Sequence, residues 1–154
     1  MLQEAKHQEI QYKAIQIIDK NLSMREKQKA ICELLLNEVA HYDWVGFYMK
    51  DPEKDELVLG QYAGAPTDHK RIPFGVGICG QGAIQQRTIN VQDVGTVDNY
   101  LACSIDTKSE LVVPIMDGNE FLGQIDIDSH TVNAFNIRDE RLLEAICKRL
   151  AEYF

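Results

Sequence analysis

Apolar side chains recur every three or four positions near the amino terminus of the chain. In residues 2–20 this spacing predicts a first helix, which ends at a polar break. Ser23 followed by Glu26 has the pattern of a capping box, so a second helix is expected to start there and to end near Ala40. Cys32 lies within this second helix, where a free cysteine usually acts as a small apolar side chain.

The pattern changes after residue 43. WVGFYMK and ELVLGQYA are separated by the charged turn of residues 51–55, and together they predict an antiparallel hairpin. The Gly- and Pro-rich residues 64–77 lead into ICGQGAIQQR, which predicts a short helix, and TINV predicts a brief strand. Residues 92–108 contain turn formers and little periodicity, which indicates a long surface loop.

A second hairpin and a final helix complete the chain. ELVVPIM and EFLGQIDIDS flank the dipeptide Asp117-Gly118, which is a strong signal for a tight turn. Asn136 and Asp139 are expected to cap a helix with an apolar stripe. Cys147 falls in that helix, so we expect it to pack in the core rather than to react.

This order of elements predicts an α+β fold. We expect a central antiparallel sheet with the N- and C-terminal helices packed on one face and loops covering a ligand pocket on the other. A length of 154 residues fits one domain. Residues 1–40 would supply the first helices, 43–135 the sheet and pocket loops, and 136–154 the last helix.

The net charge of the chain argues against some classes of binding partner. Its net charge of −8 repels phosphate backbones and anionic lipids, so neither nucleic acid nor a membrane surface is an expected partner. The sequence MLQEAKHQEIQYKAIQ lacks the apolar region of a signal peptide, which favours a cytoplasmic protein with reduced cysteines. Apolar surface left on the terminal helices would be buried by pairing, so we expect a homodimer.

Two cysteines lie at positions that favour thiol reactivity: the start of a helix and a loop. Cys79 stands among three glycines at the expected start of the short helix, and a helix N-terminus stabilises a thiolate. A glycine-rich turn with an incidental cysteine is the alternative. Cys103 lies in a loop segment with no periodicity that would explain it as part of the core. A functional role is therefore favoured for Cys103.

Acidic and aromatic side chains share faces of the predicted strands. Asp126 and Asp128 are two residues apart, so they project together and repel unless a cation or a proton lies between them. Glu110 opens the preceding strand. The alternative for these acids is a solvated face of the sheet. The acids and histidines of the chain do not have the spacing of a familiar metal-ligand set, so no metal is predicted. Trp44 and Tyr48 are four residues apart on one predicted strand, so their side chains lie on the same face. There they belong either to the core or to an aromatic wall of a pocket.

With these residues assembled, the chain resembles the free methionine-(R)-sulfoxide reductases of GAF fold. The segments that carry the resemblance are DWVGFY at 43–48, IPFGVGICG at 72–80, AC at 102–103, SELVVPI at 109–115 and DIDS at 126–129. The resemblance implies that the protein reduces free methionine sulfoxide without a cofactor. The electrons would come from thioredoxin or from a small thiol. It implies these catalytic residues: Cys103 as nucleophile, Cys79 as second cysteine, Asp126 and Asp128. It implies these substrate-binding residues: Trp44, Tyr48, Glu110, Asp126 and Asp128.

The chain departs from the family pattern near both cysteines. Members commonly carry a further cysteine just before the Ile-Pro of the glycine-rich segment, and residues 65–71 contain none. Tyr100 and Ser104 stand where a His and an Asp are common. Two alternatives therefore stay open: a non-catalytic GAF sensor that binds a small amino-acid-like or nucleotide ligand, and a purely structural dimerisation module.

Overall fold

A computed structural model describes residues 3–98, 100 and 106–154. Its helices and strands, in chain order, are α1 (Glu4–Ile18), α2 (Met24–Glu38), β1 (Trp44–Lys50), β2 (Glu56–Ala63), β3 (Arg71–Pro73), α3 (Gly77–Gln85), β4 (Ile89–Val91), the 3-10 turn η1 (Val94–Thr96), β5 (Ser109–Asp117), β6 (Glu120–Ser129) and α4 (Ile137–Ala151). Both predicted hairpins, the short helix and the brief strand are confirmed.

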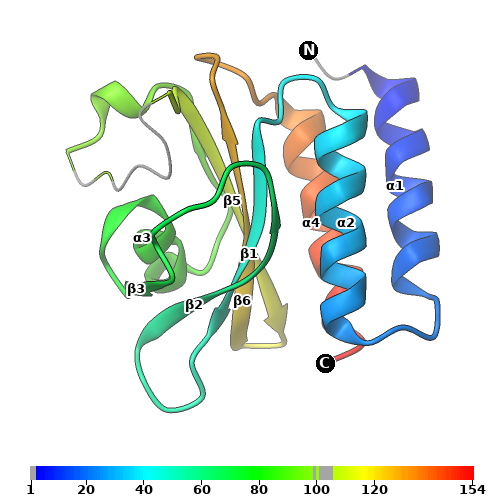
Figure 1. The fold of residues 1–154 in the computed structure, drawn as a ribbon, viewed down its shortest axis with the longest axis horizontal. Coiled ribbons are helices and arrows are strands. Elements are labelled where there is room, and N and C mark those ends of the chain that lie inside the picture. Colours follow the sequence, from blue (N-terminus) through cyan, green and yellow to red (C-terminus); the bar gives the residue numbers. More distant parts are fainter. Residues whose placement is uncertain (1–2, 99, 101–105) are drawn as a thin grey trace.

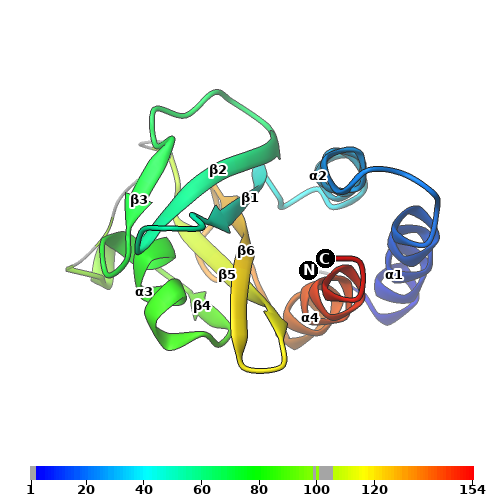
Figure 2. The same cartoon turned by 90° about the horizontal axis from the view of Figure 1, so that it is seen from below.

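The strands form one antiparallel sheet in the order β3-β2-β1-β6-β5-β4. The sheet is strongly curled, with α2 and α4 against one face and α3 on the other (Figures 1 and 2). Helix α1 forms an outer layer that packs on α2 and α4 (Figure 2). This is the predicted α+β arrangement.

The two faces of the sheet hold two separate apolar clusters. In β1, Val45 and Phe47 belong to the core beneath the helices, whereas Trp44 and Tyr48 belong to the cluster on the α3 face. Alternation of side chains along a strand produces this division. The α3 face is therefore the one that receives the acidic residues of β6.

Local signals at the helix ends are confirmed. The Ser23 hydroxyl accepts the backbone N–H of Glu26, and the Glu26 carboxylate accepts that of Ser23. Asn136 and Asp139 form the same reciprocal pair at the start of α4. Each capping box satisfies backbone donors that would otherwise lack partners.

Cys32 and Cys147 both lie in the core, which was predicted for Cys147 and agrees with the apolar role expected of Cys32. Cys32 donates to the carbonyl of Gln61 and Cys147 to that of Val113. Burial raises the pKa of both thiols, so both stay protonated. They take no part in the candidate chemistry.

Two features differ from the sequence-based expectations. Strand β3 was not predicted, because it has three residues and ends in a proline. Residues 92–108 were expected to lie on the surface, yet among those the structure describes Val94 and Thr107 are buried. Val94 is held there because η1 begins at it and its side chain packs into the cluster on the α3 face.

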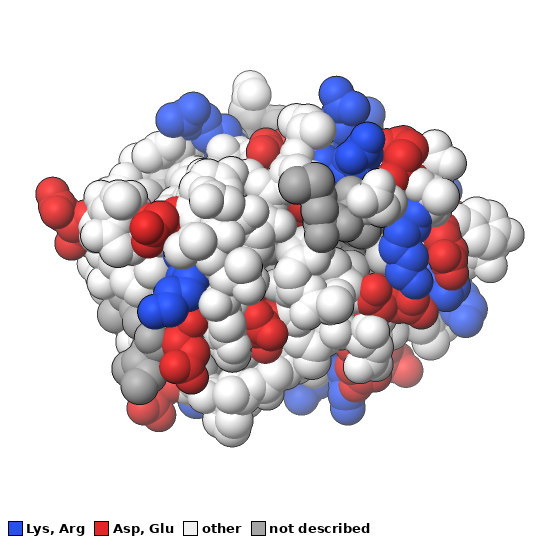
Figure 3. Space-filling model, turned by 90° about the horizontal axis from the view of Figure 1, so that it is seen from above, with Lys and Arg blue, Asp and Glu red and all other residues white. Residues whose placement is uncertain are grey.

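The described helices include none that is both long enough and apolar enough to cross a lipid bilayer. On the face seen in Figure 3, lysine and arginine side chains are interspersed with acidic ones.

Candidate active site

Three carboxyl groups meet on the α3 face of the sheet. Glu110 of β5 is the cross-strand partner of Asp128 in β6, and Asp126 lies two residues before Asp128. Trp44 of β1 is paired with Asp128 on its other side. The hydrogen-bonded backbones of three neighbouring strands therefore place an indole ring and three acids next to one another, as expected for residues on one face.

All three acids are buried, with exposed fractions of 2% for Glu110, 0% for Asp126 and 1% for Asp128. The alternative of a solvated sheet face is therefore wrong. Burial, followed by the charges of Asp126 and Asp128, raises the pKa of Glu110 well above its usual range. Burial likewise raises the pKa of Asp126. Burial and the neighbouring carboxylates therefore both favour the protonated form of Glu110.

Cys79 approaches this cluster from α3. Its thiol donates to Oε2 of Glu110 at 3.6 Å. Cys79 is the third residue of α3, close to the helix N-terminus, as its glycine-rich context indicated. Its carbonyl accepts the Nε2–H of the buried Gln124 at 2.9 Å, which ties α3 to β6.

A glycine is needed beside Cys79. A Cβ added to Gly80 would stand 2.8 Å from the carbonyl oxygen of Pro73 and 2.9 Å from the nitrogen of Gly75, both of them backbone atoms that cannot rotate away. The glycine therefore allows α3 to pack against the segment that follows β3. This close packing holds the Cys79 thiol over the sheet.

An aromatic wall adjoins the acids. The indole of Trp44 stacks on Tyr62 with ring centroids 5.6 Å apart and lies 6.3 Å from the ring of Tyr48. Its Nε1–H donates to the carbonyl of Ala65. A Cβ added to Gly46 would stand 2.2 Å from Cη2 of Trp44, so the missing side chain is what lets the indole fold back over β1.

The structure thus brings together most of the residues singled out from the sequence. They are Trp44, Tyr48, Cys79, Glu110, Asp126 and Asp128. Cys103, the expected nucleophile, lies outside the described residues. Sequence reasoning missed Tyr62 and Gln124, although Gln124 shares the even-numbered positions of Asp126 and Asp128 along β6 and could have been found from that parity.

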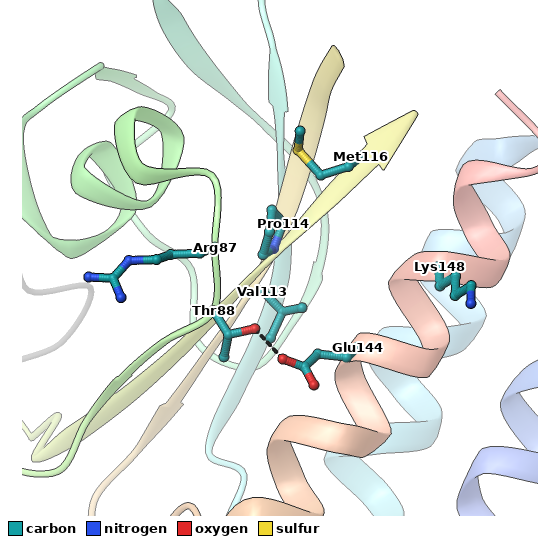
Figure 4. A pocket seen from close by; sticks show the side chains of 7 residues that line it. All are labelled: Arg87, Thr88, Val113, Pro114, Met116, Glu144 and Lys148. Carbon is teal, nitrogen blue, oxygen red and sulfur yellow. Dashed lines mark hydrogen bonds between the residues drawn. The ribbon is translucent and has the colours of Figure 1, made fainter. Parts of the chain in front are cut away.

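A groove of about 380 Å³ lies elsewhere, between the segment leading into β4, strand β5 and α4 (Figure 4). Its lining residues are Arg87, Thr88, Val113, Pro114, Met116, Glu144 and Lys148. The Thr88 hydroxyl donates to Glu144 across it. The groove shares no residue with the acid cluster and its lining contains no thiol, so it is not the candidate active site.

Comparisons with known proteins agree with this fold and site. The family model described as "GAF domain" matches residues 26–153. The chain therefore belongs to the GAF domain family. It is 40% identical to GAF domain-containing protein A of Dictyostelium discoideum over 75% of this chain and 72% of that protein.

Reductases are among its relatives. The free methionine-R-sulfoxide reductase of Escherichia coli is 34% identical over 76% of this chain and 69% of that protein. The solved structure of the free methionine-R-sulfoxide reductase of Neisseria meningitidis in complex with its substrate superposes with a TM-score of 0.92 at 29% identity, covering 100% of this chain and 92% of that one.

Proposed function

We propose that the protein reduces free L-methionine-(R)-sulfoxide to L-methionine with electrons from an external thiol. The observation that supports this most is the buried acid cluster, with Cys79 above it and Trp44 beside it. A free amino acid brings an ammonium group that suits such a cluster, whereas a peptide-bound residue does not. The reductase relatives of the chain support the same activity.

In this proposal the substrate binds by both of its ends. The ammonium group lies among Glu110, Asp126 and Asp128, where it offsets their mutual repulsion. The methyl end lies against Trp44 and Tyr48, whose rings supply an apolar wall. Arrival of the ammonium group favours the ionised form of Glu110.

The chemical step uses Cys103 as the nucleophile. Its thiolate attacks the sulfoxide sulfur while Asp126 or Asp128 donates a proton to the sulfoxide oxygen. The S–O bond of the substrate breaks, methionine leaves as the reduced product, and Cys103 is oxidised to a sulfenic acid. One oxygen atom and two oxidising equivalents have then moved from substrate to protein.

A second thiol restores Cys103. Cys79, or a small thiol from solution, condenses with the sulfenic acid, so a disulfide forms and water leaves. A dithiol reductant, of the thioredoxin kind or dithiothreitol, then reduces this disulfide and is itself oxidised. No bound metal or cofactor is needed for this sequence. We further propose a cytoplasmic homodimer as the working form.

A GAF sensor without catalysis is the second candidate. It is favoured by residues 65–71, which lack the upstream cysteine common in the family. The acid cluster would then bind an amino-acid-like ligand without chemistry. Retention of Cys79 against Glu110 favours the enzyme.

One assay separates the two candidates. The purified protein is mixed with thioredoxin, thioredoxin reductase and NADPH, and with either the R or the S epimer of free methionine sulfoxide. The reductase proposal expects NADPH oxidation with the R epimer only. Binding of the R epimer without turnover, under this reductant or dithiothreitol, would support the sensor instead.

A further inference from the structure

A thiol and two carboxyl groups converge in the floor of the candidate site. One ligand atom from each of Cys79, Glu110 and Asp126 lies within 4.8 Å of the others, and all three residues are buried. They come from α3, β5 and β6, so no local sequence motif joins them. Their relative positions are held by the sheet register and by the packing of α3.

Asp126 is the member that most needs a ligand. Its exposed fraction is 0%, and neither carboxylate oxygen meets a hydrogen-bond partner among the described residues. The neighbouring Glu110 carboxyl and Cys79 thiol offset only part of the effect of burial, which still raises the pKa of Asp126. Burying a carboxylate in this way is costly unless a cation or a proton compensates it.

The distances suit a small tetrahedral ion. Zn²⁺ binds thiolate sulfur at about 2.3 Å and carboxylate oxygen at about 2.0–2.2 Å, which separates neighbouring sulfur and oxygen ligands by roughly 3.6 Å. The Sγ of Cys79 and Oε2 of Glu110 are 3.6 Å apart. Asp126 offers a third ligand atom within 4.8 Å of both, and its closer approach to such an ion would fill a third corner of the tetrahedron.

We propose that Cys79, Glu110 and Asp126 form a binding site for a thiophilic divalent cation, best suited to Zn²⁺. One soft thiolate and two carboxylates favour Zn²⁺ over Mg²⁺ and Ca²⁺, which prefer oxygen ligands alone. The fourth position stays open to water. Binding releases the thiol proton of Cys79 and the carboxyl proton of Glu110 to solvent, because only the ionised groups coordinate.

This site overlaps the ammonium position of the proposed function. On the basis of that function, Zn²⁺ and free methionine sulfoxide compete, and Zn²⁺ inhibits the reductase by occupying the carboxylates and Cys79. The metal site itself does not require the reductase activity, because its three ligands already lie together before any substrate is added.

Binding is measured directly, without turnover, by competition between the reduced full-length protein and a chromophoric zinc chelator. We expect a single equivalent of Zn²⁺ per chain. Cys79→Ser and Asp126→Asn should each weaken binding by about 10- to 100-fold or more, since loss of even an outer-shell partner costs that much. Cys103→Ser should bind like the wild type, and unchanged affinity in Cys79→Ser would overturn the proposal.

Cys32→Ser is the matched control, because Cys32 is a buried thiol that lies on the helical side of the sheet, away from the acid cluster. It should keep wild-type affinity. If Cys79→Ser fails to fold, Cd²⁺ is added to Cys103→Ser instead. A thiolate-to-cadmium charge-transfer band of one equivalent supports the site, and its absence contradicts it.

The substrate separates this proposal from the proposed function. In Cys103→Ser, which the sulfoxide cannot oxidise at that position, free methionine-(R)-sulfoxide should raise the apparent dissociation constant for Zn²⁺ linearly with its concentration. Zn²⁺ binding that depends on Cys79 but is insensitive to the sulfoxide would support the metal site and count against the substrate site.

Discussion

Glu110 and Asp128 face each other directly across the β5–β6 ladder, on the sheet face that carries Trp44. Like charges at directly opposite positions destabilise a sheet, and burial increases that cost. Burial and the neighbouring carboxylates raise the pKa of Glu110, which favours its uncharged form and reduces this cost. The same arrangement favours the binding of a cation, because positive charge offsets the repulsion between the carboxylates.

Replacement of the two active-site cysteines should have unequal effects. Cys103→Ser should lower turnover of the R epimer by about 10³-fold or more, because it removes the nucleophile. Cys79→Ser should only weaken turnover, since a small thiol can take over resolution. The measurement is kcat with dithiothreitol as reductant. Equal activity of wild type and Cys103→Ser would eliminate the mechanism.

Glu110→Gln should act mainly on substrate binding. An amide cannot ionise to meet the substrate ammonium, and a hydrogen bond to a charged group contributes about 1.5–3 kcal/mol, so KM should rise by about 10- to 100-fold. Glu120→Gln, at the exposed start of β6, is the matched control and should leave KM unchanged. A fall in kcat with constant KM would assign Glu110 to the chemical step instead.

Gly46→Ala tests the folding of the indole over β1. The added methyl group would overlap the Trp44 ring, and overpacking of this kind costs about 1–3 kcal/mol. Urea unfolding of the single and double variants measures it. In a Trp44→Phe background the smaller ring leaves room, so the same glycine substitution should cost less; an equal cost in both backgrounds would show that the clash lies elsewhere.

Asp51 should make stability depend on pH at the acidic end. Its carboxylate accepts the backbone N–H groups of Glu53 and Lys54 and the guanidinium of Arg71, which join the β1–β2 turn to β3. The Glu53 N–H and then Arg71 lower the pKa of Asp51 to about 2. This stabilisation is complete above the unfolded-state pKa of about 3.9 and is lost as the pH falls through about 2.

Asp51→Asn should therefore lower the thermal midpoint at pH 7, and the difference from wild type should shrink below about pH 4. Asp55→Asn, an exposed acid in the same turn, is the control. A difference between wild type and Asp51→Asn that stays constant down to pH 2 would mean that the charge of Asp51 is not what stabilises the turn.

Sequence patterns predicted the features that depend on neighbours along the chain. The capping box of Ser23 and Glu26 and the shared face of Asp126 and Asp128 follow from spacing alone. The contact between Cys79 and Glu110 could not be predicted in this way, because it depends on how α3 packs across the sheet. Burial of the acids could not be predicted either, because alternating polar residues along a strand fit a solvent-exposed face as well as a buried one.

The grouping of a thiol with two carboxyl groups was hidden from the sequence for the same physical reason. No metal was predicted because the acids show no familiar ligand spacing, yet a thiol and two carboxyl groups from three separate elements lie within 4.8 Å of one another. Ligands that are gathered by tertiary packing leave no spacing to detect. The cysteine enters the set only once the position of α3 is known.

The row of buried acids also carries a thermodynamic consequence. A sheet that holds Glu110, Asp126 and Asp128 away from water is less stable than the same sheet with apolar side chains there. Whatever supplies positive charge at this position recovers part of the difference, so the melting temperature reports occupancy. A ligand that binds at the acid cluster should therefore raise the melting temperature. A thermal-shift screen of cations and amino acids would identify such a ligand without an assay of turnover.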